Sequence, residues 1–165
     1  MKACTRARWS TRVGLACLVA AAVACSMETR VSSLSKALSQ AADLHRQAEA
    51  KVAGGDIEGA VRCLRQAATA VPEGSEEGPD VRTDAYAEIS RLWTAQGEGA
   101  RAEEAARTAI GHTREASFFQ GLAWLRLGDA LKLQGRGREA VAAFERSIAI
   151  NTLTQERILL RRRAR

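Results

Sequence analysis

The chain has 165 residues, which is enough for one domain with a short appendage. Aromatic residues make up only 4% of it, and the two prolines and the absence of alternating β-branched runs favour an all-α fold with a core of small and aliphatic side chains. The net charge of +6 is concentrated at the two ends, because four bases lie in residues 1–25 and four arginines in residues 161–165. Residues 26–160 hold 17 bases against 19 acids, which argues against a uniformly basic, nucleic-acid-binding body.

The N-terminus has the layout of a bacterial export signal. A basic segment, residues 1–12, precedes an apolar run at residues 13–24, which is shorter than the roughly 20 residues of a spanning helix. The run ends in Ala22-Val23-Ala24-Cys25, which resembles the lipobox of bacterial lipoproteins, although Ala22 stands where Leu is usual. The resemblance implies that residues 1–25 are a signal peptide and that Cys25 carries the lipid. With Ser26 after the cysteine instead of Asp, it implies an outer-membrane address facing the periplasm.

Other readings of this segment stay open. Leu15-Ala16-Cys17 is a second, weaker lipobox match, and cleavage after an A-x-A-like site would give a secreted soluble protein. An uncleaved anchor is a third alternative. Once the signal and Cys25 are set aside, Cys63 is the remaining cysteine, so we expect no internal disulfide. We expect Cys63 to be a small packed side chain, with an intermolecular disulfide as the alternative.

A short tether at residues 26–32 is expected to lead into a helical domain at residues 33–165. Ser32 or Ser33 is a candidate N-cap for a first helix that runs to about Ala53 and breaks at Gly54-Gly55. Asp56 is expected to cap the returning helix, which stops before Pro72. The two helices carry apolar residues at helical spacing, which predicts a first helical hairpin.

A second hairpin is expected after the acidic loop at residues 72–80. Asp80 is a candidate cap for its first helix, which breaks at Gln96-Gly97-Glu98-Gly99, and the returning helix carries Ala102, Ala106 and Ala109. Residues 111–117 are then expected to be a loop.

The stretch at residues 124–147, WLRLGDALKLQGRGREAVAAFERS, predicts a third hairpin. Gly128 and Ala140 are expected where two helices approach closely, and the space around them is expected to be filled by larger side chains (Trp124, Leu127, Leu131 and Phe144). This pattern resembles the tetratricopeptide repeat (TPR). The turn glycines Gly55, Gly97 and Gly135 are 42 and 38 residues apart, against 34 in the standard repeat. The resemblance implies a right-handed solenoid of three TPR-like hairpins.

The C-terminal segment is expected to end the solenoid. Thr152 and Gln155 match a capping box, which predicts a separate helix at residues 153–163 that caps the exposed apolar end. The tail ILLRRRAR has three readings: contact with anionic lipid headgroups behind a lipid anchor, phosphate contacts with nucleic acid if the chain stays in the cytoplasm, or a solvated helix end.

No catalytic, cofactor-binding or metal-ligating motif is found. His45 and His112 lie in separate repeats without ligand spacing, and there is no C-x-x-C, G-x-S-x-G or phosphate-binding glycine loop after a strand. We therefore expect a non-enzymatic protein without cofactors. The resemblance implies a concave face that binds a peptide or helix of an envelope protein, as in an assembly factor, and its candidate contact residues are His45, Glu49, Arg91, Asp129 and Lys132. Other positions expected on that face are Ala42, Val52, Asp84, Ala87, Thr94, Leu122 and Leu125.

Overall fold

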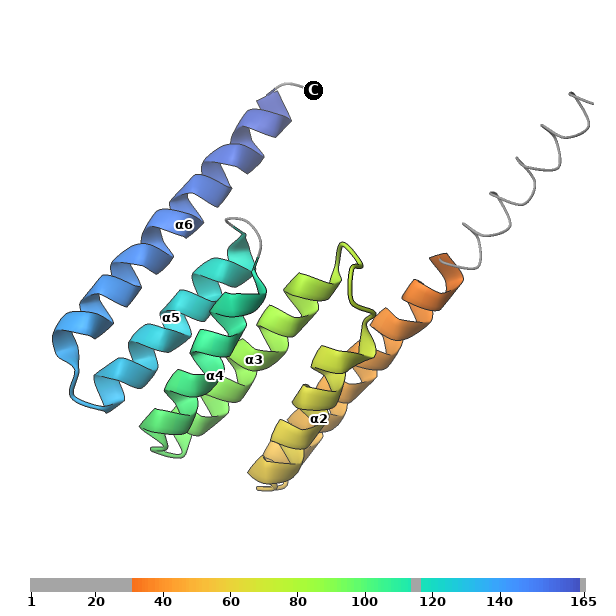
Figure 1. Ribbon diagram of the computed structural model, residues 1–165, viewed down its shortest axis with the longest axis horizontal. Coiled ribbons are helices and arrows are strands. Elements are labelled where there is room, and N and C mark those ends of the chain that lie inside the picture. The colour runs from red at the N-terminus through yellow and green to blue at the C-terminus, as the bar shows by residue number, and fades with distance from the viewer. Residues whose placement is uncertain (1–30, 114–116, 164–165) are drawn as a thin grey trace, which may run out of the picture. The chain divides into compact units, whose positions relative to one another are not determined.

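The computed structural model describes residues 31–113 and 117–163, with side chains up to residue 158 (Figure 1). The expected signal peptide, Cys25 and most of the tether lie outside the described residues. The chain divides into two compact units, Met1–Lys36 and Ala37–Arg165. Residues 31–36, the described part of the first unit, are helical, so the predicted start of the helix at residue 33 was wrong by at least two residues. No helix in the described ranges has the length and hydrophobicity needed to cross a membrane.

The second unit consists of helices joined by short turns. A helix over residues 37–53 is followed by α2 (Ile57–Ala70), α3 (Gly78–Ala95), α4 (Gly99–His112), α5 (Phe118–Leu133) and α6 (Gly137–Arg163). No strand occurs among the described residues, which confirms the prediction of an all-α fold. The predicted breaks at residues 54–55, 96–99 and 134–137 coincide with the turns between consecutive helices.

Three of the turns share one geometry, which explains the glycine at each. Gly55, Gly97 and Gly135 have φ values of 80°, 79° and 75°, a left-handed conformation that side chains with a Cβ rarely adopt. In each turn the glycine N–H donates to the carbonyl three residues before it, and the next N–H donates to the carbonyl five residues before it. This is the Schellman arrangement, which satisfies carbonyl groups at the end of a helix. The chain therefore reverses direction three times by the same mechanism.

The helix N-termini match the expected caps in one case and differ in another. The side chain of Asp56 accepts a hydrogen bond of 2.8 Å from the N–H of Gly59, as expected of an N-cap. The prediction that Asp80 caps α3 was wrong, because the helix already begins at Gly78 and Asp80 lies in its first turn. The N-cap residue is Glu77, whose side chain makes no capping bond. The Ser75 hydroxyl accepts a hydrogen bond of 3.1 Å from the N–H of Gly78, and Pro79 fixes the backbone of the first turn.

Each helix of the second unit packs mainly against its neighbours in the chain. Helix α2 contacts α3, α3 contacts α4 and α5, α4 contacts α5, and α5 contacts α6, so that the helices lie side by side in chain order (Figure 1). The core that they enclose is rich in alanine, with a few larger side chains such as Leu64, Ile89, Trp93 and Leu131. Small side chains allow helix axes to lie close together, as the composition predicted.

Gly128 and Ala140 lie at the close contact between α5 and α6, as predicted. A Cβ atom on Gly128 would lie 2.4 Å from Cε1 of Phe144, so the phenylalanine ring occupies the space that the glycine leaves free. Ser147 holds the same two helices together, because its buried hydroxyl donates a hydrogen bond of 2.7 Å to the carbonyl of Gly121. The residues of the third hairpin that the sequence singled out therefore form its interface.

The predicted separate capping helix is not observed. Helix α6 runs without a break from Gly137 to Arg163. The Thr152 hydroxyl donates to the carbonyl of Ile148, four residues earlier in the same helix, and therefore does not cap a new one. Apolar side chains along α6 stay exposed, including Val141, Ile148, Leu153 and Ile158.

Candidate functional site

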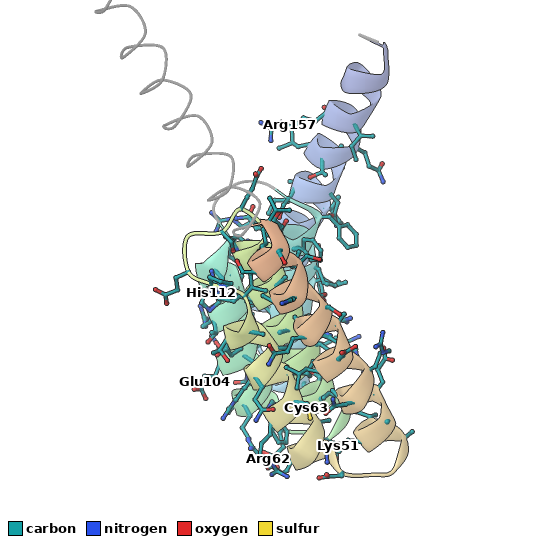
Figure 2. All side chains as sticks on the ribbon, turned by 90° about the vertical axis from the view of Figure 1, so that its right-hand side faces the viewer. Lys51, Arg62, Cys63, Glu104, His112 and Arg157 are labelled. Carbon is teal, nitrogen blue, oxygen red and sulfur yellow. The ribbon has the colours of Figure 1, made fainter. Side chains whose placement is uncertain are left out.

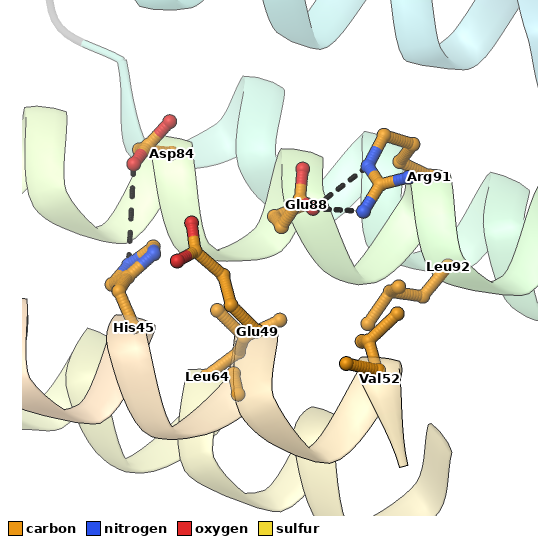
Figure 3. Close-up of a pocket in the computed structure, with 10 residues that line it drawn as sticks. His45, Glu49, Val52, Leu64, Asp84, Glu88, Arg91 and Leu92 are labelled. Carbon is orange, nitrogen blue, oxygen red and sulfur yellow. Dashed lines mark hydrogen bonds and ion pairs between the residues drawn. The ribbon is translucent and has the colours of Figure 1, made fainter. Parts of the chain in front are cut away.

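The candidate site is a pocket between the helix at residues 37–53 and α3, with a residue of α2 at its base (Figure 3). Its volume is about 430 Å³. The lining combines an apolar base with charged side chains at the rim: His45, Ala48, Glu49, Val52, Ala53, Leu64, Asp84, Glu88, Arg91 and Leu92. Concave sites of this composition are typical of binding surfaces.

The pocket forms because two helices present residues at helical spacing to the same space. His45, Glu49 and Val52 lie on successive turns of the first helix, and Asp84, Glu88 and Arg91 do so on α3. Leu64 and Leu92 are almost completely buried beneath them. The base is therefore part of the hydrophobic core, while the charged groups remain accessible.

His45 and Asp84 face each other across the pocket. The His45 Nε2 atom lies 3.9 Å from the Asp84 carboxylate, which is an ion-pair distance only when the imidazole is protonated. Burial raises the pKa of the Asp84 carboxyl above its ordinary value; nearby His45 lowers this pKa and Glu88 raises it. The carboxylate thus lies in a place where its charge is incompletely compensated.

Glu88 and Arg91 form an ion pair along α3. The Arg91 Nε donates a hydrogen bond of 2.7 Å to Glu88, and its Nη2 donates a second one to the same oxygen. Hydrogen bonding to Glu88 raises the pKa of Arg91, so the guanidinium stays charged. Glu49, by contrast, forms no ion pair or side-chain hydrogen bond with any described residue, and Figure 3 shows its carboxylate extending into the pocket.

The structure brings three of the five candidate contact residues together and separates the other two. His45, Glu49 and Arg91 line the pocket. Asp129 and Lys132 do not: Asp129 pairs with Arg126 of the same helix at 3.5 Å, and Lys132 is exposed. This pocket therefore does not form one continuous surface that includes all five residues.

Of the other residues expected on the concave binding face, some line the pocket and others do not. Val52 and Asp84 line the pocket, whereas Ala42, Thr94, Leu122 and Leu125 do not. Ala87 is 1% exposed and packs with Ala109 and Ala123, so its placement on an open face was wrong. Sequence reasoning missed Glu88, although its spacing of four residues from Asp84 and three from Arg91 places all three on one side of α3.

Other polar or reactive residues that lie outside the pocket contact neighbouring side chains or are buried in the core. His112 stacks on Tyr86 with 5.5 Å between ring centroids, and burial, together with the charge of Arg82, lowers the pKa of His112. Cys63 is buried, which confirms its prediction as a packed side chain. Figure 2 shows Lys51 near the first turn, where its Nζ donates a bond of 2.9 Å to Asp56. Within the described residues, no group of three His, Cys, Asp or Glu side chains could hold a metal ion.

Comparison of the chain with protein-family models, curated proteins and solved structures found no match.

Proposed function

We propose that this chain is a non-enzymatic TPR-like scaffold that binds a peptide or a helix of an envelope protein, and that lipid on Cys25 holds it at the periplasmic face of the outer membrane. The observation that carries the binding role is the pocket formed by the helix at residues 37–53 and α3. It offers accessible apolar surface at Val52 and Ala53, and charged groups at the rim to orient a backbone or a side chain.

Three hairpins with the same Schellman turn support the repeat part of the proposal. Repeat proteins stack such hairpins into a right-handed solenoid and use the surface formed by the first helix of each pair for binding. Both helices that supply the rim of the pocket, the one at residues 37–53 and α3, are first helices of their hairpins. The position of the pocket therefore agrees with the surface that a TPR-like protein uses.

A peptide-display selection tests the binding role without a known partner. Random dodecapeptides would be selected on the wild-type protein and counter-screened on Ala53→Trp, which places a bulky side chain in the pocket from an exposed position. Ala142→Trp is the matched control, because Ala142 is exposed on α6 and lies outside the pocket lining. We expect peptides that bind the wild type and Ala142→Trp but lose binding to Ala53→Trp. A selection that yields no peptide sensitive to Ala53→Trp would reject the pocket as the binding site.

A further inference from the structure

We propose that the pocket receives the side chain of a lysine or arginine from a basic segment of the partner protein. This inference rests on the proposed function and specifies the chemistry of the partner. It follows from three features of the described pocket: the balance of its charges, the position of its free carboxylate and its apolar base.

The charges of the lining do not balance. Glu49, Asp84 and Glu88 are carboxylates, whereas Arg91 is the only permanently charged cation among the lining residues. Arg91 is already paired with Glu88 through two hydrogen bonds. Among the lining residues, Glu49 and Asp84 are therefore left without a permanently charged cation of their own.

These two carboxylates come from opposite walls and can act on one ligand. Glu49 extends from the helix at residues 37–53, and Asp84 faces that helix from α3, 3.9 Å from His45 (Figure 3). A guanidinium or ammonium group between the walls would replace water around both carboxylates with charge-assisted hydrogen bonds. The burial that raises the pKa of Asp84 indicates that this carboxylate would gain from such a cation.

The base of the pocket suits the rest of a basic side chain. The partly buried Val52 and the exposed Ala53 offer carbon atoms beside the charged rim, and Leu64 and Leu92 lie almost completely buried beneath them. Lysine and arginine have three or four methylene groups before the charged end, which pack on apolar surface while the head remains among polar groups. An acidic side chain would gain nothing from this base and would be repelled by Glu49 and Asp84. A purely apolar side chain would leave the carboxylates without a partner.

A defined peptide pair tests the charge requirement directly. The probe is an acetylated, amidated peptide with the sequence ILLRRRAR, which is also the sequence of residues 158–165, and its twin carries citrulline at every arginine. Citrulline keeps nearly the shape of arginine, but a carbonyl oxygen replaces one NH2 group, so its side chain has no charge and three N–H donors where the guanidinium has five. We expect the citrulline peptide to bind on the order of tenfold more weakly in titration calorimetry, as for the loss of a charged hydrogen bond.

Isosteric variants locate the interaction. Glu49→Gln and Asp84→Asn are each expected to weaken binding of the arginine peptide by about tenfold and to leave the citrulline peptide unaffected. Glu104→Gln is the matched control, because Glu104 is an exposed carboxylate on α4 outside the pocket (Figure 2). Equal binding of the two peptides, or arginine-dependent binding that both pocket variants retain, overturns the inference.

The display selection separates failure of this inference from failure of the proposed function. Peptides that depend on an open pocket but show no excess of lysine and arginine over the starting library would overturn the basic-partner inference and leave the binding role intact. Self-association of the full chain that disappears when residues 159–165 are deleted would overturn the assignment to a separate partner, since a second copy would then supply the basic segment. Sedimentation of the full and shortened chains measures this outcome.

Discussion

Gly128 shows how one absent side chain sets the distance between two helices. Because a Cβ at this position would meet the ring of Phe144 at 2.4 Å, Gly128→Ala must push the ring or α6 away. Overpacking costs about 1–3 kcal/mol, and the better helix propensity of alanine returns up to about 1 kcal/mol. We expect a net loss of about 1 kcal/mol in the free energy of unfolding, measured by urea denaturation.

Gly111→Ala provides the matched control for this substitution. Gly111 also lies in a helix, but no atom lies within 4 Å of the Cβ that would be added, so alanine there should leave stability unchanged or raise it slightly. Equal stability of Gly128→Ala and wild type would show that α5 and α6 are not closely packed at this point.

At Asp84, in contrast to Gly128, a substitution is expected to raise the free energy of unfolding. Burial raises the pKa of its carboxyl in the folded state, so ionisation destabilises the fold as the pH rises through this pKa. Asp84→Asn should therefore raise the free energy of unfolding at pH 7, by about 0.5 kcal/mol because the side chain is partly exposed, and have no effect near pH 3. Denaturation at both pH values checks this, with Glu49→Gln as a control without a folded-state partner among the described residues. A destabilised Asp84→Asn at pH 7 would mean that His45 compensates the charge of Asp84 more fully than we infer.

At the scale of the element, the sequence predicted the turn glycines correctly but predicted two helix N-termini wrongly. Gly55, Gly97 and Gly135 each follow an apolar helical pattern, and the left-handed conformation they adopt is one that few other residues tolerate. Asp80 and Thr152 also looked like caps, yet capping residues are common inside helices too. The sequence could not show that α3 begins at Gly78, where the Ser75 hydroxyl accepts a hydrogen bond from the backbone N–H. Nor could it show that the Thr152 hydroxyl would donate to a carbonyl within α6.

The turn between α5 and α6 is tied to α4 by Glu103, and this tie should depend on pH. Its carboxylate accepts hydrogen bonds from Gln134, Arg107 and Arg136, which lower the pKa of Glu103 from 4.5 to about 2 against the opposing effect of burial. A folded-state pKa below the unfolded one stabilises the protein above about pH 4.5, and this contribution is lost as the pH falls towards 2.

Glu103→Gln tests the tie between these helices. Since the network reaches solvent and is screened, we expect a loss of about 1 kcal/mol at pH 7 that shrinks between pH 4.5 and pH 2. Chemical denaturation at a series of pH values measures the difference, and Glu104→Gln on the same helix should show no such dependence. A loss that stays constant down to pH 2 would assign the effect to geometry instead of charge.

At the scale of the whole molecule, periodicity predicted the helices and their pairing, but not which faces would meet. Ala87 and Asp84 lie three residues apart on α3, yet one is buried against Ala109 and Ala123 and the other lines the pocket. That difference depends on how α3 packs against α4 and α5, which the periodicity of a single helix does not specify. Asp129 and Lys132, which the sequence also placed on the binding face, do not line the pocket.

The proposed location at the outer membrane requires lipid on Cys25, and the fate of that thiol tests it. If the lipobox resemblance holds, a Gram-negative host will produce a chain that starts at Cys25, carries a lipid-sized mass increment and sediments with membranes. Two or more acyl chains anchor a protein stably, because each buried methylene contributes about 0.8 kcal/mol. Intact-mass measurement and membrane fractionation should show both properties lost in Cys25→Ala and retained in Cys17→Ala, the variant at the rival site. A soluble, unmodified full-length chain would remove the lipid anchor, and the search for a partner of the acidic pocket would then move away from the envelope.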